Sequence, residues 1–190
     1  GAYAGFGTSA IAGPVSKAGG LGIITASALR TPEKFKEDIA KARAMTDKPI
    51  GVNLSPHNVK DVDAIIDTII SERIKVVETI GTNAAAYGRR FKDAGIVWIH
   101  KVATVKHAIS AEKSGADAVV IVGIEGAGSK SPVQVTTLIN IPMAVKLIKI
   151  PVIAAGGIGD ARGFMAALAM GAEAVYLGSA FMMTKECPIS

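Results

Sequence analysis

Short apolar segments alternate with longer amphipathic segments along the whole chain. Uninterrupted apolar runs of this kind are typical of strands that are buried on both faces of a parallel sheet. The segments between them carry apolar residues at helical spacing, as Val62, Ile65, Ile66 and Ile69 do. The alternation therefore predicts an α/β protein in which helices connect parallel strands. We place the strands at 21–25, 49–54, 74–77, 96–102, 116–122, 151–155 and 174–177.

Capping residues mark the ends of several predicted helices. Thr31 precedes a proline, and Thr104 and Asp160 each offer a side-chain oxygen to the first turn of a helix. Pro14 should kink or shorten a helix at 9–18, and Pro142 should mark a break in one at 134–147. Further helices are expected at 59–72, 84–92 and 104–114. Another should begin at Thr31, and one more should lie between Asp160 and Gly171.

The regular repeat of strand and helix favours a (β/α)₈ TIM barrel, with an open doubly wound sheet as the structural alternative. Residues 1–4 are expected to be the end of a further, first strand. A complete barrel has about 250 residues. We therefore expect the 190 residues to form a single domain, 1–190, that is trimmed at both ends of the barrel.

Composition excludes several classes of function. The net charge of +5 is dispersed, with no basic run, so nucleic-acid binding is not expected. No charge-free apolar stretch reaches the roughly 18 residues that suggest a membrane span. The single cysteine, Cys187, suits a reducing compartment, and we expect a cytoplasmic protein with no metal site.

Two glycine turns follow the last two predicted strands. Gly156 and Gly157 come after the strand at 151–155, and Gly178 and Ser179 come after the next one. Converging backbone N–H groups at helix starts bind anions, and a TIM barrel commonly holds a phosphate at the corresponding loops. The two turns therefore predict a phosphate site and favour the closed barrel, although such glycines also occur simply as tight turns.

Four stretches of the chain resemble the flavin-dependent nitronate monooxygenase (2-nitropropane dioxygenase) family, which includes flavin-dependent enoyl-acyl-carrier-protein reductases. They are SKAGGLGII at 16–24, GVNL at 51–54, AAGGIGDARG at 154–163 and GAEAVYLGSAFMMTKECP at 171–188. The resemblance spans nearly the whole chain in the same order. It implies a TIM barrel that binds one FMN at the carboxyl ends of its strands.

The resemblance also implies roles for individual residues. The FMN phosphate would lie on Gly156, Gly157, Gly178 and Ser179. Asn53 would hydrogen-bond the flavin ring, Lys101 would lie near the flavin N1 and C2 carbonyl, and Gly1, Ala2 and Gly123 would contact the cofactor. A fixed ammonium would stabilise the negative charge of a reduced flavin. From the residues alone, Lys101 could instead reach solvent and Asn53 could brace the rim of the barrel.

One departure from the family concerns acid–base chemistry. Many members carry a glycine–glycine–histidine motif in the loop after the strand at 116–122, and Ser129 stands where that histidine would be. A serine hydroxyl takes up no proton at neutral pH without an activating base. Candidate catalytic residues are therefore Ser129 itself, Lys101 and His57, although a lone loop histidine is more often a solvated surface residue.

We expect an FMN-dependent oxidoreductase that oxidises a nitronate or a similar small anion with oxygen. A nitronate is already deprotonated, so its oxidation does not need the missing histidine. The alternatives are an NAD(P)H-dependent flavin reductase acting on a quinone or enoyl thioester, and a non-catalytic flavin-binding or structural subunit. A small-molecule substrate and assembly into a homo-oligomer are further expectations. IMP dehydrogenase chemistry is disfavoured because the loop at 126–137 has no cysteine.

Overall fold

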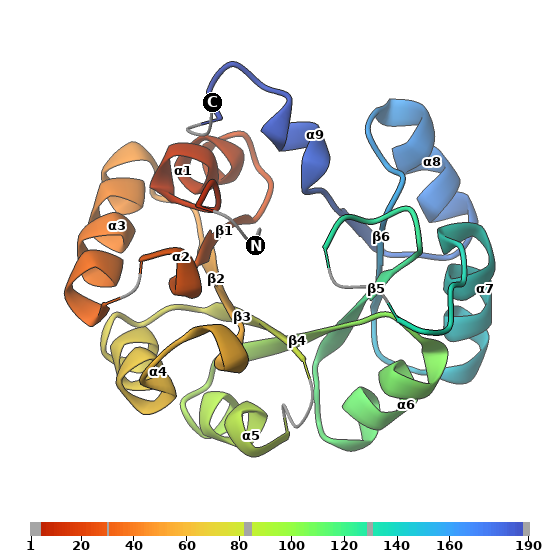
Figure 1. The fold of residues 1–190 in the computed structure, drawn as a ribbon, viewed down its shortest axis with the longest axis horizontal. Coiled ribbons are helices and arrows are strands. Elements are labelled where there is room, and N and C mark those ends of the chain that lie inside the picture. Colours follow the sequence, from red (N-terminus) through yellow and green to blue (C-terminus); the bar gives the residue numbers. More distant parts are fainter. Residues whose placement is uncertain (1–4, 30, 82–84, 129–130, 188–190) are drawn as a thin grey trace.

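The computed structural model describes residues 5–29, 31–81, 85–128 and 131–187. Its centre is a sheet of seven parallel strands whose spatial order is their order in the chain (Figure 1). The helices form a ring around the strands (Figure 1). The strands are β1 (Gly22–Thr25), β2 (Ile50–Leu54), β3 (Val76–Ile80), β4 (Val97–Val102), β5 (Ala118–Val122), β6 (Val152–Ala155) and β7 (Ala174–Tyr176).

The sequential strand order decides between the two predicted topologies. A doubly wound sheet reverses its order at a switch point, whereas this sheet runs from β1 to β7 without reversal. The doubly wound alternative is therefore wrong. The arrangement is that of a barrel over seven strands, and the predicted further strand at 1–4 lies outside the described residues.

The helices that cover the outside of the sheet follow most of the predicted ranges. The one at 160–171 begins after Asp160, whose carboxylate accepts hydrogen bonds from two backbone N–H groups, as predicted. Thr31 and Thr104 are likewise confirmed as caps. The helices are α1 (Ser9–Lys17), α2 (Ala26–Leu29), α3 (Pro32–Met45), η1 (Pro56–Asn58), α4 (Val62–Ser71), α5 (Ala85–Asp93), α6 (Val105–Lys113), α7 (Thr137–Leu147), α8 (Ala161–Ala169) and α9 (Ser179–Met182).

Both internal prolines are accommodated inside helices, contrary to the predicted break at Pro142. Each removes one backbone hydrogen bond to a carbonyl four residues earlier. For Pro142 that carbonyl belongs to Leu138, which is 70% exposed, so water can replace the missing donor. Helix α7 starts later than predicted because the carbonyl of Val135 accepts a hydrogen bond from Ile124 in the preceding loop.

Strand β3 begins and ends later than the predicted range 74–77. Ile74 still belongs to the turn that ends α4, since its backbone N–H donates to the carbonyl of Ile69. Arg73 in that turn has a φ of 52°, the left-handed conformation that reverses the chain. The shift places Glu78 inside the strand, and its side chain becomes central to the site described below.

The apolar core has two parts, one on each face of the sheet. The larger part lies between the strands and the surrounding helices, where Trp98 and Phe91 are fully buried. The smaller part lies inside the barrel and contains Ile99, Val120 and Ala155. Within the described residues no helix is both long and apolar enough to cross a bilayer.

Candidate functional site

Four polar side chains from four strands meet inside the barrel. Asn53 on β2 is the register partner of Glu78 on β3, and its amide nitrogen lies 2.5 Å from Glu78 Oε2. The ammonium of Lys101 on β4 lies 3.0 Å from Glu78 Oε1. The hydroxyl of Tyr176, the last residue of β7, lies 3.3 Å from Glu78 Oε2. One carboxylate on β3 thus contacts side chains from its two neighbouring strands, β2 and β4, and from the distant edge strand β7.

This cluster contains an ion pair that is almost removed from solvent. The side chain of Glu78 is 1% exposed and that of Lys101 is 12% exposed. Burial pushes the pKa of Glu78 upward, whereas positive charge, above all that of Lys101, and the hydrogen bond from Asn53 push it downward, and this pKa lies below its ordinary value. Glu78 is therefore a carboxylate at neutral pH, and Asn53 must present its NH₂ group to it because a carboxylate only accepts.

Besides their shared contact with Glu78, Tyr176 and Lys101 contact each other directly. The Lys101 ammonium lies 4.7 Å from the centroid of the Tyr176 ring, within the range of a cation–π contact, and 3.4 Å from its hydroxyl. The ring therefore lies against the flexible lysine and limits the positions that its ammonium can take. A positive charge is held toward the carboxyl ends of the strands, where barrel enzymes place their sites.

His100 points to the other face of the sheet, as its position next to Lys101 requires. Thr79 Oγ1 accepts a hydrogen bond from Trp98 Nε1 and lies 2.8 Å from His100 Nδ1. Burial lowers the pKa of His100, only partly offset by the charge of Glu78, so the ring is neutral at neutral pH. This histidine takes part in packing against the helices.

The two predicted glycine turns leave the same edge of neighbouring strands. Ala155 and Tyr176 are register partners, so both turns start beside each other. Gly156 and Gly157 have φ values of 99° and 73°, which favour glycine. The backbone N–H groups of Gly157 and Ser179 donate to no acceptor among the described residues, and a Cβ on Gly178 would meet no described atom within 4 Å.

The carboxylate of Asp160 restricts where an anion can bind. It accepts hydrogen bonds from the backbone N–H groups of Arg162 and Gly163, which are the first-turn donors of α8. Helix α9 has only four residues, so its dipole is small. A phosphate would therefore bind to the N–H groups of the two turns, because the first-turn donors of α8 are already bonded and α9 is short.

A neighbouring loop braces the first glycine turn. The Glu125 carboxylate accepts hydrogen bonds from the backbone N–H and the hydroxyl of Thr137 at the start of α7. Gly123 donates from its backbone N–H to the carbonyl of Ala155. A Cβ on Gly156 would lie 3.0 Å from Gly126 N and 3.2 Å from Gly123 N. The loop after β5 and the turn after β6 therefore pack backbone to backbone.

The predicted site residues do not all come together. Asn53 and Lys101 lie in the polar cluster, while Gly123, Gly156, Gly157, Gly178 and Ser179 lie at the neighbouring loops. His57 is exposed on η1, close to Gly81 in the loop after β3. Gly1, Ala2 and Ser129 lie outside the described residues.

Sequence reasoning missed Glu78 and Tyr176. The available signal was a lone acidic residue in the stretch VVETI at 76–80, which is otherwise uncharged. The strand was predicted at 74–77 and ending near Gly81, and no role was given to the acidic residue within it. For Tyr176, nothing in the sequence distinguishes an inward ring from a packed one.

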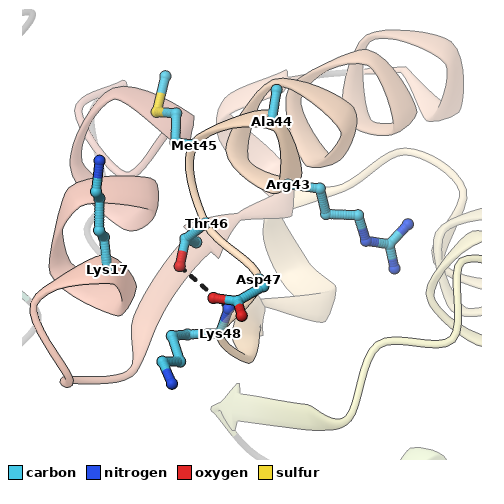
Figure 2. Close-up of a pocket in the computed structure, with 7 residues that line it drawn as sticks. All are labelled: Lys17, Arg43, Ala44, Met45, Thr46, Asp47 and Lys48. Atoms are coloured by element: carbon cyan, nitrogen blue, oxygen red, sulfur yellow. Dashed lines mark hydrogen bonds between the residues drawn. The ribbon is translucent and has the colours of Figure 1, made fainter.

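A separate hollow of about 360 Å³ lies at the amino ends of the strands, between the end of α1 and the loop before β2. Figure 2 shows Lys17 and Lys48 beside it, with the Arg43 side chain pointing away from both. Arg43 is paired with Glu72 at 2.9 Å. The hollow is larger than the 20 Å³ space near Gly123, yet it lies far from the polar cluster and contains no comparable buried charge.

Comparison with known proteins places these features in a family. The sequence model of nitronate monooxygenase matches residues 2–72 and 55–190, which together cover almost the whole chain. A "probable nitronate monooxygenase" of Staphylococcus aureus is 30% identical over 226 aligned positions, covering 96% of this chain and 63% of that protein.

Other relatives carry other names. A "(3aS,4S,5R,7aS)-5-hydroxy-7a-methyl-1-oxo-octahydro-1H-indene-4-carboxyl-CoA dehydrogenase" of Rhodococcus jostii is 39% identical, covering 94% of this chain and 51% of that protein. Among solved structures, FabK from Thermotoga maritima superposes with a TM-score of 0.91 at 38% identity, covering all of this chain and 60% of that one. Nitroalkane oxidase from Streptomyces ansochromogenes gives 0.88 at 25% identity, covering 99% and 66%.

The chain thus spans between about half and two thirds of the proteins it resembles. An IMP dehydrogenase/GMP reductase-like protein from Corynebacterium glutamicum, at 19% identity and a TM-score of 0.78, shares the fold alone. The family model, the named oxidoreductases and the barrel architecture agree. This chain belongs to the nitronate monooxygenase family of oxidoreductases.

Proposed function

We propose that this chain is the FMN-binding barrel of a flavin-dependent oxidoreductase. The observation that carries the proposal is the pair of glycine turns that leave β6 and β7 side by side. The conformations of Gly156 and Gly157 favour glycine, and the space beside Gly178 is open. Backbone N–H groups in such turns suit a phosphate.

The residues present fit the rest of the cofactor as well. Gly156, Gly157, Gly178 and Ser179 would hold the phosphate, and Asn53 and Lys101 would face the ring. With its NH₂ directed at Glu78, Asn53 retains a carbonyl oxygen that can accept a hydrogen bond from a ring N–H. When bound, FMN supplies the transfer of a hydride or of electrons, chemistry that amino-acid side chains lack.

The chain's own side chains would supply the electrostatics. Lys101 holds a positive charge that stabilises an anion at the carboxyl ends of the strands. Its contacts with Glu78 and Tyr176 fix that charge before any substrate binds, so little reorganisation is needed during reaction. The inner wall beside the cluster is apolar, because Val120 and Ala155 are the register partners of Lys101 and Tyr176 and are almost fully buried.

Two substrate classes follow from the relatives. An acyl-CoA thioester is favoured by the Rhodococcus dehydrogenase, which is 39% identical to this chain. A nitronate is favoured by the family model and by the Staphylococcus protein, which is 30% identical. We propose thioester oxidoreduction first, because the more similar relative acts on a CoA thioester, and nitronate oxidation second.

Anaerobic mixing of the flavin-loaded protein distinguishes the two classes. We expect NADH or NADPH to bleach the flavin absorbance and an α,β-unsaturated acyl-CoA to restore it, because two electrons pass from the nicotinamide through the flavin to the alkene. Bleaching by propane-2-nitronate alone, with none by either nicotinamide, would instead support nitronate oxidation. In that case we expect the anion to react much faster than neutral 2-nitropropane near neutral pH.

A further inference from the structure

Glu78 and Lys101 are exceptional among the strand residues. Within the seven described strands, Glu78 is the only acidic side chain and Lys101 is the only lysine or arginine. They come from neighbouring strands, lie 3.0 Å apart and are almost completely buried. Such a pair gains little stability over well-packed apolar residues, because desolvation offsets the attraction. Packing alone therefore does not account for its presence.

Glu78 also organises the groups around it. Its Oε2 accepts from Asn53 at 2.5 Å and from Tyr176 at 3.3 Å, while its Oε1 faces Lys101. One carboxylate thus sets the position of an amide, a phenol and an ammonium that belong to β2, β7 and β4. Each of these three groups is closer to the carboxyl end of its strand than Glu78 is in β3.

We infer that Glu78 is a positioning residue that fixes the Lys101 ammonium and offsets its charge, and that it would thereby lower the reduction potential of a bound flavin. This inference rests on the proposed function. A lysine without a counter-ion would favour the reduced, negatively charged ring strongly. Because Glu78 lies beside Lys101, the two charges nearly cancel, and the stabilisation of the reduced flavin by Lys101 is weakened.

The inference predicts opposite effects for two single substitutions. Glu78→Gln keeps the shape of the side chain and an oxygen for Asn53 but removes the negative charge, so the flavin midpoint potential should rise. Lys101→Met removes the positive charge, so the potential should fall. We expect each shift to be about 30 mV or more, equal to a tenfold change in a two-electron equilibrium. The double variant should return close to the wild-type potential.

The measurement is a spectrophotometric redox titration of the FMN-loaded protein against a reference dye. Glu173→Gln is the matched control, because Glu173 is an exposed glutamate just before the amino end of β7. It makes the same change in charge far from the cluster and should leave the potential unchanged. A purely structural role for Glu78 would alter FMN affinity without opposite potential shifts.

The outcomes separate this inference from the proposed function. If the wild-type chain binds no flavin, both are wrong. If it binds FMN but Glu78→Gln leaves the potential unchanged or lowers it, only the role of Glu78 is wrong. If both single variants shift the potential in the same direction, charge compensation by Glu78 is likewise excluded. Opposite shifts that cancel in the double variant support the inference.

Discussion

Gly156→Ala should lose FMN binding by at least about 100-fold, equivalent to about 2.8 kcal/mol. Gly156 has a φ of 99°, and alanine in such a conformation is strained by about 1–3 kcal/mol. The new Cβ would also lie 3.0 Å from both Gly126 N and Thr137 Oγ1, so the turn after β6 must move away from the loop after β5. That movement displaces the N–H groups proposed to bind the phosphate. Quenching of FMN fluorescence on titration with protein measures the affinity.

Gly171→Ala is the matched control for backbone strain. Gly171 has a similar φ of 94°, and a Cβ there would also meet a neighbour at 3.0 Å. It lies between α8 and β7, at the opposite end of the strands. We expect this variant to lose stability yet retain FMN. Equal loss of FMN in both variants would show that general destabilisation, rather than the turn, explains the effect.

Lys101→Met should destabilise the fold by about 3–5 kcal/mol at neutral pH, because it leaves a buried carboxylate without its counter-ion. The same substitution should reverse the pH dependence contributed by Glu78. In the wild-type protein burial raises the pKa of Glu78, whereas positive charge, above all that of Lys101, and the Asn53 hydrogen bond lower it, and the folded-state pKa lies below its ordinary value. The stabilisation is therefore present above the unfolded-state pKa of about 4.3 and lost as the pH falls through the folded-state value.

Without Lys101, burial should dominate and raise the folded-state pKa of Glu78. A group with a raised pKa stabilises the fold below its unfolded-state pKa and loses that contribution as the pH rises through the folded-state pKa. Urea unfolding of Lys101→Met between about pH 5.5 and pH 8 should thus show declining stability where the wild-type contribution of Glu78 is constant. Adding Glu78→Gln should recover much of the loss. Identical pH profiles for wild type and Lys101→Met would contradict the buried ion pair.

The repeating pattern of the sequence was sufficient to predict the seven described strands and their parallel order. Local chemistry also identified Thr31, Thr104 and Asp160 as caps, because a side-chain oxygen just before a helix commonly accepts a hydrogen bond from a backbone N–H group of the first turn. The internal prolines misled the prediction. Whether water reaches the carbonyl that a proline leaves without a donor depends on which face of the helix is exposed, and for Pro142 the tertiary structure decides it.

The candidate site was predictable only in part. Gly156 and Gly157 were recognisable because their positive φ values are a backbone requirement that few residues can meet. Glu78 was not recognisable, because its significance lies in partners 25, 23 and 98 residues away in the sequence. The register of four strands brings these partners together, and a one-residue shift of β3 would turn the carboxylate toward the helices.

The N-terminus of α8, whose backbone donors are bonded to Asp160, shows a further limit of prediction from sequence. Asp160 was predicted as a cap, and its carboxylate does take up two of the backbone donors there. The phosphate was predicted on Gly156, Gly157, Gly178 and Ser179, beside a helix start whose bare N–H groups would add to the site. At α8 the cap occupies two of these helix-start donors, so they are not available to an anion. The phosphate proposal consequently depends on the turns at Gly157 and Ser179.

The most direct test of the account compares the affinities of the chain for FMN and for riboflavin, which differ only in the phosphate. Two or more charge-assisted hydrogen bonds of about 1.5–3 kcal/mol each predict that FMN binds at least about 100-fold more tightly. Fluorescence titration or calorimetry with the purified protein measures both constants. A large preference for FMN would support a phosphate site at the glycine turns, whereas equal affinities, or no binding of either flavin, would contradict it.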